Sequence, residues 1–168
     1  MANQPLGLYF EEFELGKVMV TRGRTITEAD LVNFAGLTGD YNPMHTDAEY
    51  AKNTQFGQRI AHGMLGLSYM VGLVYQMGFL EGTIIAFLDA TCKFRAPILI
   101  GDTIHGEMTV SELKDAERMG GGMVTSSFKL IKQDGTVTQK GEMVFLMKKR
   151  PIESAPDTFT AGNVVPAS

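Results

Sequence analysis

The chain has 168 residues, of which 44% are apolar and 20% charged, a composition typical of a folded globular domain rather than a disordered chain. Its formal net charge is -4 and it contains no dense Lys/Arg cluster, which argues against a nucleic-acid-binding protein. The single cysteine, Cys92, excludes an intrachain disulfide and a cysteine-based zinc finger.

The length fits one domain over residues 1–150, followed by a flexible tail over residues 151–168 that is rich in Pro, Ala, Thr and Ser. Residues 1–5 lack the basic stretch and apolar core of a secretory signal. We therefore expect a cytoplasmic protein.

The first elements are a strand over Leu15–Thr25 and a helix that begins after Thr27. Asp30 lies three residues after Thr27, the spacing of a capping box. Gly36 and Gly39 are expected to end this helix.

The segment Gly39–His45 has the composition of a loop, in which Pro43 keeps Asn42 out of the α region. A short second helix is predicted to start at Thr46, with Glu49 in its first turn.

A long uncharged segment follows, Ile60–Leu80, with no Asp, Glu, Lys or Arg. It is long enough to cross a bilayer, but it contains four glycines and is surrounded by amphipathic strand patterns. We favour a helix buried at the centre of the domain and retain a membrane span as the alternative.

Strand patterns with a period of two fill the rest of the domain. Asp134-Gly135 is a strong hairpin signal between the last two strands. The predicted strands are Thr83–Leu88, Thr91–Phe94, Thr103–Leu113, Met123–Lys132 and Val137–Lys149. The order of elements predicts an α+β fold, with a strongly curved antiparallel sheet wrapped around the apolar helix.

Asp40 and His45 are the first candidates for chemistry, because one short segment holds a carboxylate and an imidazole. Such a pair can share one water molecule and exchange protons with it. The plainer interpretation, in which Asp40 caps a turn and His45 fills the edge of a pocket, stays open on spacing alone.

His62-Gly63, at the predicted start of the apolar helix, is the second candidate. Backbone N–H groups at a helix start lack intrahelical acceptors, and a glycine leaves them unshielded, which suits an oxyanion. A metal site made by Asp40, His45 and His62 is not expected, because no usual ligand spacing is present.

Two strings, Gly39-Asp40-Tyr41-Asn42-Pro43-Met44-His45 and Ala61-His62-Gly63-Met64, resemble the motifs of the MaoC-like dehydratases and R-specific enoyl-CoA hydratases. The Gly-Asp-x-Asn-Pro-x-His signature is complete, whereas Ala48 stands where many members carry Pro. The resemblance covers roughly residues 10–150 and implies the hotdog fold.

The resemblance also implies roles for these residues in reversible hydration of trans-2-enoyl thioesters to (R)-3-hydroxyacyl thioesters. Asp40 and His45 would activate water, and the Gly63 amide would polarise the thioester carbonyl. Substrate-binding roles are assigned to Asn42, His62, Met64, Leu65 and Ser68. The resemblance implies no metal or redox cofactor. The thiol carrier, CoA or acyl carrier protein, is part of the substrate.

Family members form dimers that join two sheets, so we expect at least a homodimer. Two alternatives remain: a hotdog thioesterase, in which water attacks the carbonyl carbon, and a non-catalytic module that binds acyl thioesters. Chain length and the choice between CoA and acyl carrier protein stay open.

Overall fold

One antiparallel sheet dominates the computed structural model, which describes residues 7–151. Its strands run in the order β1-β4-β5-β6-β3, and β2 pairs with β4. Their bounds are β1 Val18–Val20, β2 Arg24–Thr25, β3 Ile84–Phe94, β4 Thr103–Ala116, β5 Gly121–Lys132 and β6 Val137–Lys148. The sheet confirms the predicted α+β class.

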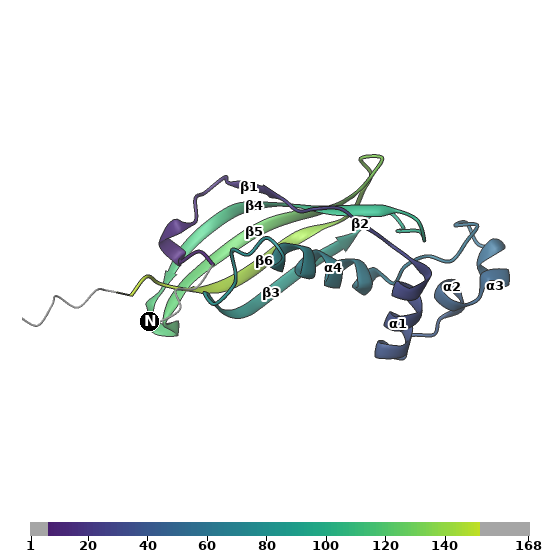
Figure 1. Ribbon diagram of the computed structural model, residues 1–168, viewed down its shortest axis with the longest axis horizontal. Coiled ribbons are helices and arrows are strands. Elements are labelled where there is room, and N and C mark those ends of the chain that lie inside the picture. The colour runs from purple at the N-terminus through teal and green to yellow at the C-terminus, as the bar shows by residue number, and fades with distance from the viewer. Residues whose placement is uncertain (1–6, 152–168) are drawn as a thin grey trace, which may run out of the picture.

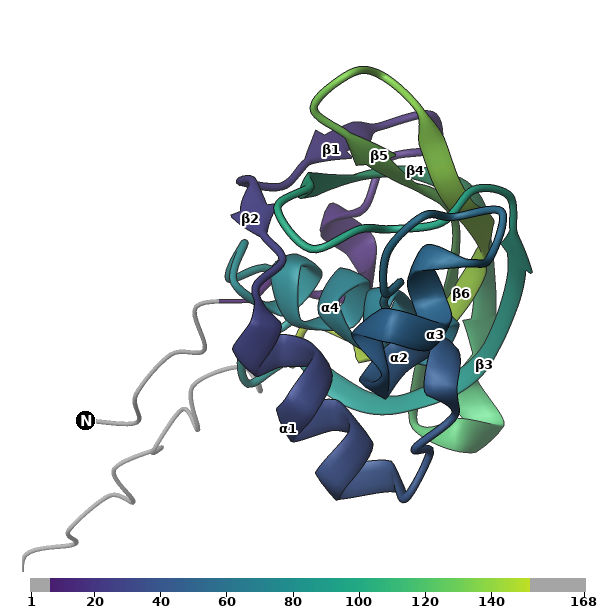
Figure 2. The ribbon, with the colours of Figure 1, turned by 90° about the vertical axis from the view of Figure 1, so that its right-hand side faces the viewer.

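Within residues 7–151, four α-helices pack on or beside the sheet: α1 Glu28–Thr38, α2 Pro43–Thr46, α3 Ala48–Lys52 and α4 Gly63–Tyr75. Short 3-10 turns cover Phe10–Glu12 and Glu117–Met119. The sheet curls around α4, and α1, α2 and α3 lie together at one end of the molecule (Figures 1 and 2).

The central helix α4 is shorter than the predicted segment Ile60–Leu80 but is buried as expected. Its buried side chains meet apolar residues of β4, β5 and β6 in one core. These core residues include Leu65, Met70, Val74, Ile104, Met108, Val124, Phe128, Met143 and Phe145. None of the helices within residues 7–151 is long and apolar enough to span a membrane, so the membrane alternative for this segment is wrong.

Helix α1 starts and ends largely as the sequence predicts. Thr27 is its N-cap, and the Asp30 carboxylate accepts hydrogen bonds from the Thr27 N–H and hydroxyl at 2.7 and 2.8 Å. Gly39 ends the helix in the left-handed region, with φ of 76°. Gly36 does not end it, because its backbone stays helical.

Two expectations about the next segment are wrong. Residues 43–46 form the short helix α2 rather than a loop, because a proline at the first helical position carries a suitable φ and needs no hydrogen-bond acceptor. The following helix is capped by Asp47, not Thr46: the Asp47 carboxylate accepts from the N–H groups of Glu49 and Tyr50.

Two strand boundaries also differ from the prediction. The expected strand Leu15–Thr25 forms two strands, β1 and β2. Val20 pairs with Glu107 and Arg24 with Ile104, so this segment contains one residue more than the part of β4 that it faces. A side-chain oxygen replaces a backbone acceptor there: the Gly106 N–H donates to the Thr21 hydroxyl at 2.8 Å. Conversely, the two expected strands within residues 83–94 form the single strand β3, which continues through two register shifts.

The predicted hairpin at Asp134-Gly135 is confirmed, with Gly135 at φ of 85° between β5 and β6. The predicted flexible tail, apart from Pro151, lies outside the described residues.

Candidate active site

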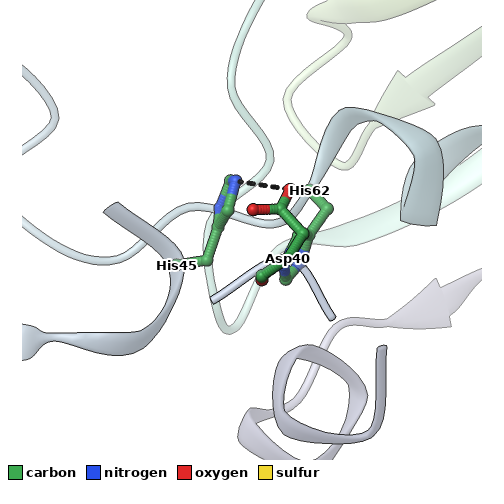
Figure 3. A group of neighbouring side chains, drawn as sticks. All are labelled: Asp40, His45 and His62. Carbon is green, nitrogen blue, oxygen red and sulfur yellow. Dashed lines mark hydrogen bonds and ion pairs between the residues drawn. The ribbon is translucent and has the colours of Figure 1, made fainter. Parts of the chain in front are cut away.

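Asp40 and His45 lie close together at the end of the molecule where α4 begins, as the sequence interpretation required. The Asp40 Oδ2 atom is 4.0 Å from His45 Nε2, and Figure 3 shows the carboxylate turned toward the imidazole ring. His45 is buried whereas the Asp40 side chain is half exposed. This distance leaves the two groups close enough to contact one common water molecule.

Two successive side-chain turns hold the segment that carries this pair. The Asn42 N–H donates to the Asp40 carboxylate at 3.2 Å, and the Met44 N–H donates to the Asn42 side chain at 3.2 Å. Such turns let Asp and Asn fix the backbone two residues ahead. Asn42 therefore orients Asp40 and starts the helix that carries His45.

A backbone carbonyl fixes the protonation pattern of His45. Its Nδ1 atom is 2.8 Å from the carbonyl oxygen of Ile60, and because a carbonyl only accepts, Nδ1 carries the proton. In the neutral ring the Nε2 lone pair therefore faces Asp40. Burial lowers the pKa of His45 and is the largest effect. The hydrogen bond to the Ile60 carbonyl and the charge of Asp40 raise this pKa, whereas His62 lowers it further, and the pKa lies below 6.5.

His62 completes the cluster from the residue just before α4. Its Nε2 atom is 2.9 Å from the backbone oxygen of Asp40, so Nε2 carries the proton. Its ring stacks on that of His45, with centroids 3.8 Å apart and planes 27° apart. Within the part of the chain that the structure describes, its Nδ1 atom is buried without a hydrogen-bond partner.

The nitrogen and carboxylate atoms of Asp40, His45 and His62 lie within 4.8 Å of one another, which is close enough for metal ligands. One nitrogen of each imidazole is bound to a carbonyl oxygen, an arrangement that also occurs in metal-binding histidines. A cation would have the His45 Nε2 atom, the Asp40 carboxylate and the buried His62 Nδ1 atom. The His45 Nε2 atom and the Asp40 carboxylate are also the groups that can exchange protons with a shared water molecule.

Gly63 lies beside this cluster at the wall of a cavity of about 430 Å³, which His45 and His62 also line. As the first residue of α4, its N–H group has no intrahelical acceptor and lies at the positive end of the helix. A side chain there would be crowded, since an added Cβ would lie 2.8 Å from the Phe94 ring.

The other predicted binding residues do not gather at this cavity. The Leu65 side chain packs in the core, with 3% exposed. Met64 and Ser68 are exposed, and the Ser68 hydroxyl donates to the Met64 carbonyl at 2.8 Å. The cavity lining contains none of these three residues. Their assignment as substrate-binding residues stays a prediction, and within one chain the cavity offers no support for it.

The sequence analysis missed Gln139, whose side-chain amide donates to the Gly63 carbonyl at 2.8 Å from the neighbouring strand β6. Gln139 is 2% exposed and lines the cavity. Gln139 lies on the same buried face of β6 as Met143 and Phe145. A polar residue at a position where the strand pattern expects an apolar one could have pointed to it.

Comparisons with known proteins identify relatives of this chain. Residues 12–130 match the family described as the MaoC like domain. A 3-hydroxybutyryl-CoA dehydratase from Methylorubrum extorquens is 39% identical over 108 residues, which cover 63% of this chain and 66% of that protein. The matched part is thus slightly less than two thirds of that relative.

Two solved structures share the fold over most of the chain. A monoamine oxidase regulatory protein from Archaeoglobus has a TM-score of 0.80 and 37% identity, over 86% of this chain and 97% of that one. The R-hydratase PhaJ1 from Pseudomonas aeruginosa has a TM-score of 0.74 and 30% identity, over 96% of both chains. The chain therefore belongs to the MaoC-like domain family and has the hotdog fold.

Proposed function

We propose that the protein is a hydro-lyase that reversibly adds water to trans-2-enoyl thioesters, giving (R)-3-hydroxyacyl thioesters. The observation that carries this proposal is the Asp40–His45 pair, 4.0 Å apart, whose His45 ring also lines the cavity beside the Gly63 amide. The dehydratase and hydratase names of the relatives support the same reaction class.

In the hydration direction, the pair would hold one water molecule near C3 of the enoyl group. The neutral His45 ring offers the Nε2 lone pair and Asp40 offers a carboxylate, so both groups accept protons. As the water oxygen bonds to C3, its proton passes to the pair, and the C2=C3 electrons move toward the thioester oxygen. A proton from the pair then goes to C2, so the atoms of one water are added across the bond.

The charge that develops on the thioester oxygen requires a hydrogen-bond donor. The Gly63 N–H, at the positive end of α4, is suited to this task. The hydrogen bond from Gln139 to the Gly63 carbonyl fixes the peptide that follows. Removal of one donor to an oxyanion typically costs about 10²- to 10³-fold in rate.

The test is hydration of crotonyl-CoA, followed by the loss of enoyl absorbance, with the wild type, Asp40→Asn and His45→Gln. Each variant removes one proton acceptor and should lower kcat by about 10²- to 10⁴-fold. Chiral analysis of the product should give the (R)-3-hydroxy isomer. Unchanged kcat in both variants would contradict the assigned roles.

One alternative is favoured by a specific observation, namely the resemblance to a regulatory protein. A non-catalytic acyl-thioester-binding module would bind enoyl-CoA without changing its absorbance.

The other alternative is a thioesterase, which would release free thiol that a thiol reagent detects directly. The intact Asp40–His45 pair favours hydration over both.

We also propose a homodimer formed through β3. This strand lies at one end of the sheet, and the large apolar residues exposed on it are Ile85, Phe87, Leu88 and Phe94. An exposed apolar edge strand favours pairing with another strand. Light scattering should give about twice 18.4 kDa, and a mass of one chain at working concentration would refute the dimer.

The thiol carrier of the acyl group, CoA or acyl carrier protein, is part of the proposed substrate. The cavity of about 430 Å³ has apolar walls that include Phe56, Phe94, Pro97 and Ile98. A series of enoyl thioesters of increasing chain length on each carrier would define the preference.

A further inference from the structure

His62 is buried, with 2% of its surface exposed, yet neither the water activation nor the oxyanion contact described above uses it. It is the N-cap of α4 by position, but its side chain does not cap the helix. A buried imidazole that does not serve its own helix needs another role.

The side-chain hydrogen bond of His62 and its stacked ring both lead to the Asp40–His45 pair. The Nε2–H group donates to the Asp40 carbonyl at 2.9 Å and so holds the backbone that carries the carboxylate. The ring face lies against the His45 ring at 3.8 Å and restricts the tilt of that ring. The His62 backbone carbonyl meanwhile accepts the N–H of Leu65 at 3.0 Å, which ties the residue to the first turn of α4.

The two imidazoles therefore have opposite tautomers. His45 carries its proton on Nδ1, toward Ile60, whereas His62 carries its proton on Nε2, toward Asp40. A change of tautomer in either ring would place a lone pair against a carbonyl oxygen, and a 180° rotation would replace the N–H donor with a C–H group; both are unfavourable. Each ring is thus fixed by one carbonyl and by its neighbour.

We propose that His62 is a positioning residue that fixes the Asp40 backbone and the His45 ring so that the His45 Nε2 lone pair faces the Asp40 carboxylate. This inference rests on the proposed hydration activity. It assigns His62 a role different from substrate binding, which the sequence alone suggested. Because His62 would act through the pair, its loss should lower kcat and leave KM nearly unchanged.

Three substitutions separate the two contacts. His62→Gln keeps an amide N–H that can reach the Asp40 carbonyl but loses the stacked ring, whereas His62→Phe keeps a flat ring and loses the donor. Each should lower kcat by about 10-fold, and His62→Ala should lower it by about 10²-fold, because misplacement of catalytic groups is costly. KM should change by less than about 3-fold in all three.

Phe34→Leu is the matched control, since Phe34 packs on the His62 ring at 5.1 Å without a polar contact to the pair. It should lower the free energy of unfolding while kcat changes by less than about 3-fold. A rise in KM with unchanged kcat in the His62 variants would instead indicate substrate binding and overturn the proposal.

Nitrogen NMR on the wild type tests the geometry independently of activity. The chain has three histidines, so the ring signals can be assigned by substitution. We expect the Nδ1–H tautomer for His45 and the Nε2–H tautomer for His62, with a mixed tautomer for His45 in His62→Ala. A His62 proton on Nδ1 would refute the proposal even if the enzyme is active. An inactive wild type with both expected tautomers would refute only the hydratase assignment.

Discussion

Asp30 allows the strongest quantitative prediction, because four groups from three residues donate hydrogen bonds to its buried carboxylate. They are the Thr27 N–H and hydroxyl, the Arg24 guanidinium at 2.7 Å and the Tyr69 hydroxyl. Burial alone would raise the pKa of Asp30, but the bonds from Tyr69, Thr27 and Arg24 outweigh it and lower the pKa from 3.8 to about 2.

The difference between these two pKa values corresponds to about 2 kcal/mol of folding stability, at 1.36 kcal/mol per pH unit. Because the folded state has the lower pKa, this stabilisation is present above pH 3.8 and is lost as the pH falls through about 2. Asp30→Asn also places an amide NH₂ against the two Thr27 donors. An unsatisfied buried donor adds about 1 kcal/mol or more, so the total loss at pH 7 should be about 3 kcal/mol.

The assay is urea unfolding of the wild type and Asp30→Asn at several pH values between 7 and 2, at equal protein concentration. The difference between them should shrink by about 2 kcal/mol across the acid range, because the asparagine cannot titrate. Loss of other carboxylates affects both proteins and cancels. Glu14→Gln, which removes an exposed charge, should stay within about 0.5 kcal/mol of the wild type. A difference that is independent of pH would refute the reasoning.

The site and the sheet give three further predictions. Since the pKa of His45 lies below 6.5, kcat/KM should persist below pH 6.5 and fall only as the ring gains a proton; an acidic limb at or above 6.5 would contradict this. Gly141→Ala should lower the free energy of unfolding by at least about 3 kcal/mol in urea unfolding, because its Cβ would overlap the Thr91 carbonyl of β3. Gly63→Ala should leave the unfolding midpoint nearly unchanged, since the Phe94 side chain it meets is half exposed, but should reduce kcat/KM at least several-fold; wild-type kcat/KM would exclude a tight fit at this position.

Local sequence rules predicted the elements whose causes are themselves local. Thr27 and Asp30 mark the start of α1 within four residues, and Asp134-Gly135 fixes a hairpin between two adjacent strands. The sequence did not predict the division of the strand at Thr21, because the compensating hydrogen bond comes from Gly106 on a strand 85 residues away.

The same distinction applies to the candidate site. The spacing of Asp40, Asn42 and His45 is local, and two side-chain turns plus one helical turn at Pro43 bring the two ionisable residues close together. The proximity of Asp40 and His45 was thus predicted from a segment whose backbone was described wrongly as a loop, because both conformations keep this short segment compact.

His62 and Gln139 depend instead on packing between segments far apart in the chain. The stack between His45 and His62 joins residues 17 positions apart, and Gln139 reaches Gly63 across 76 positions. A single sequence shows only which residue types stand at these positions: a histidine before an apolar helix, and a glutamine on the inward face of a strand. Because burial makes an unpaired polar group costly, each such residue implies a partner, and only the fold identifies that partner as the Asp40–His45 pair or the Gly63 peptide.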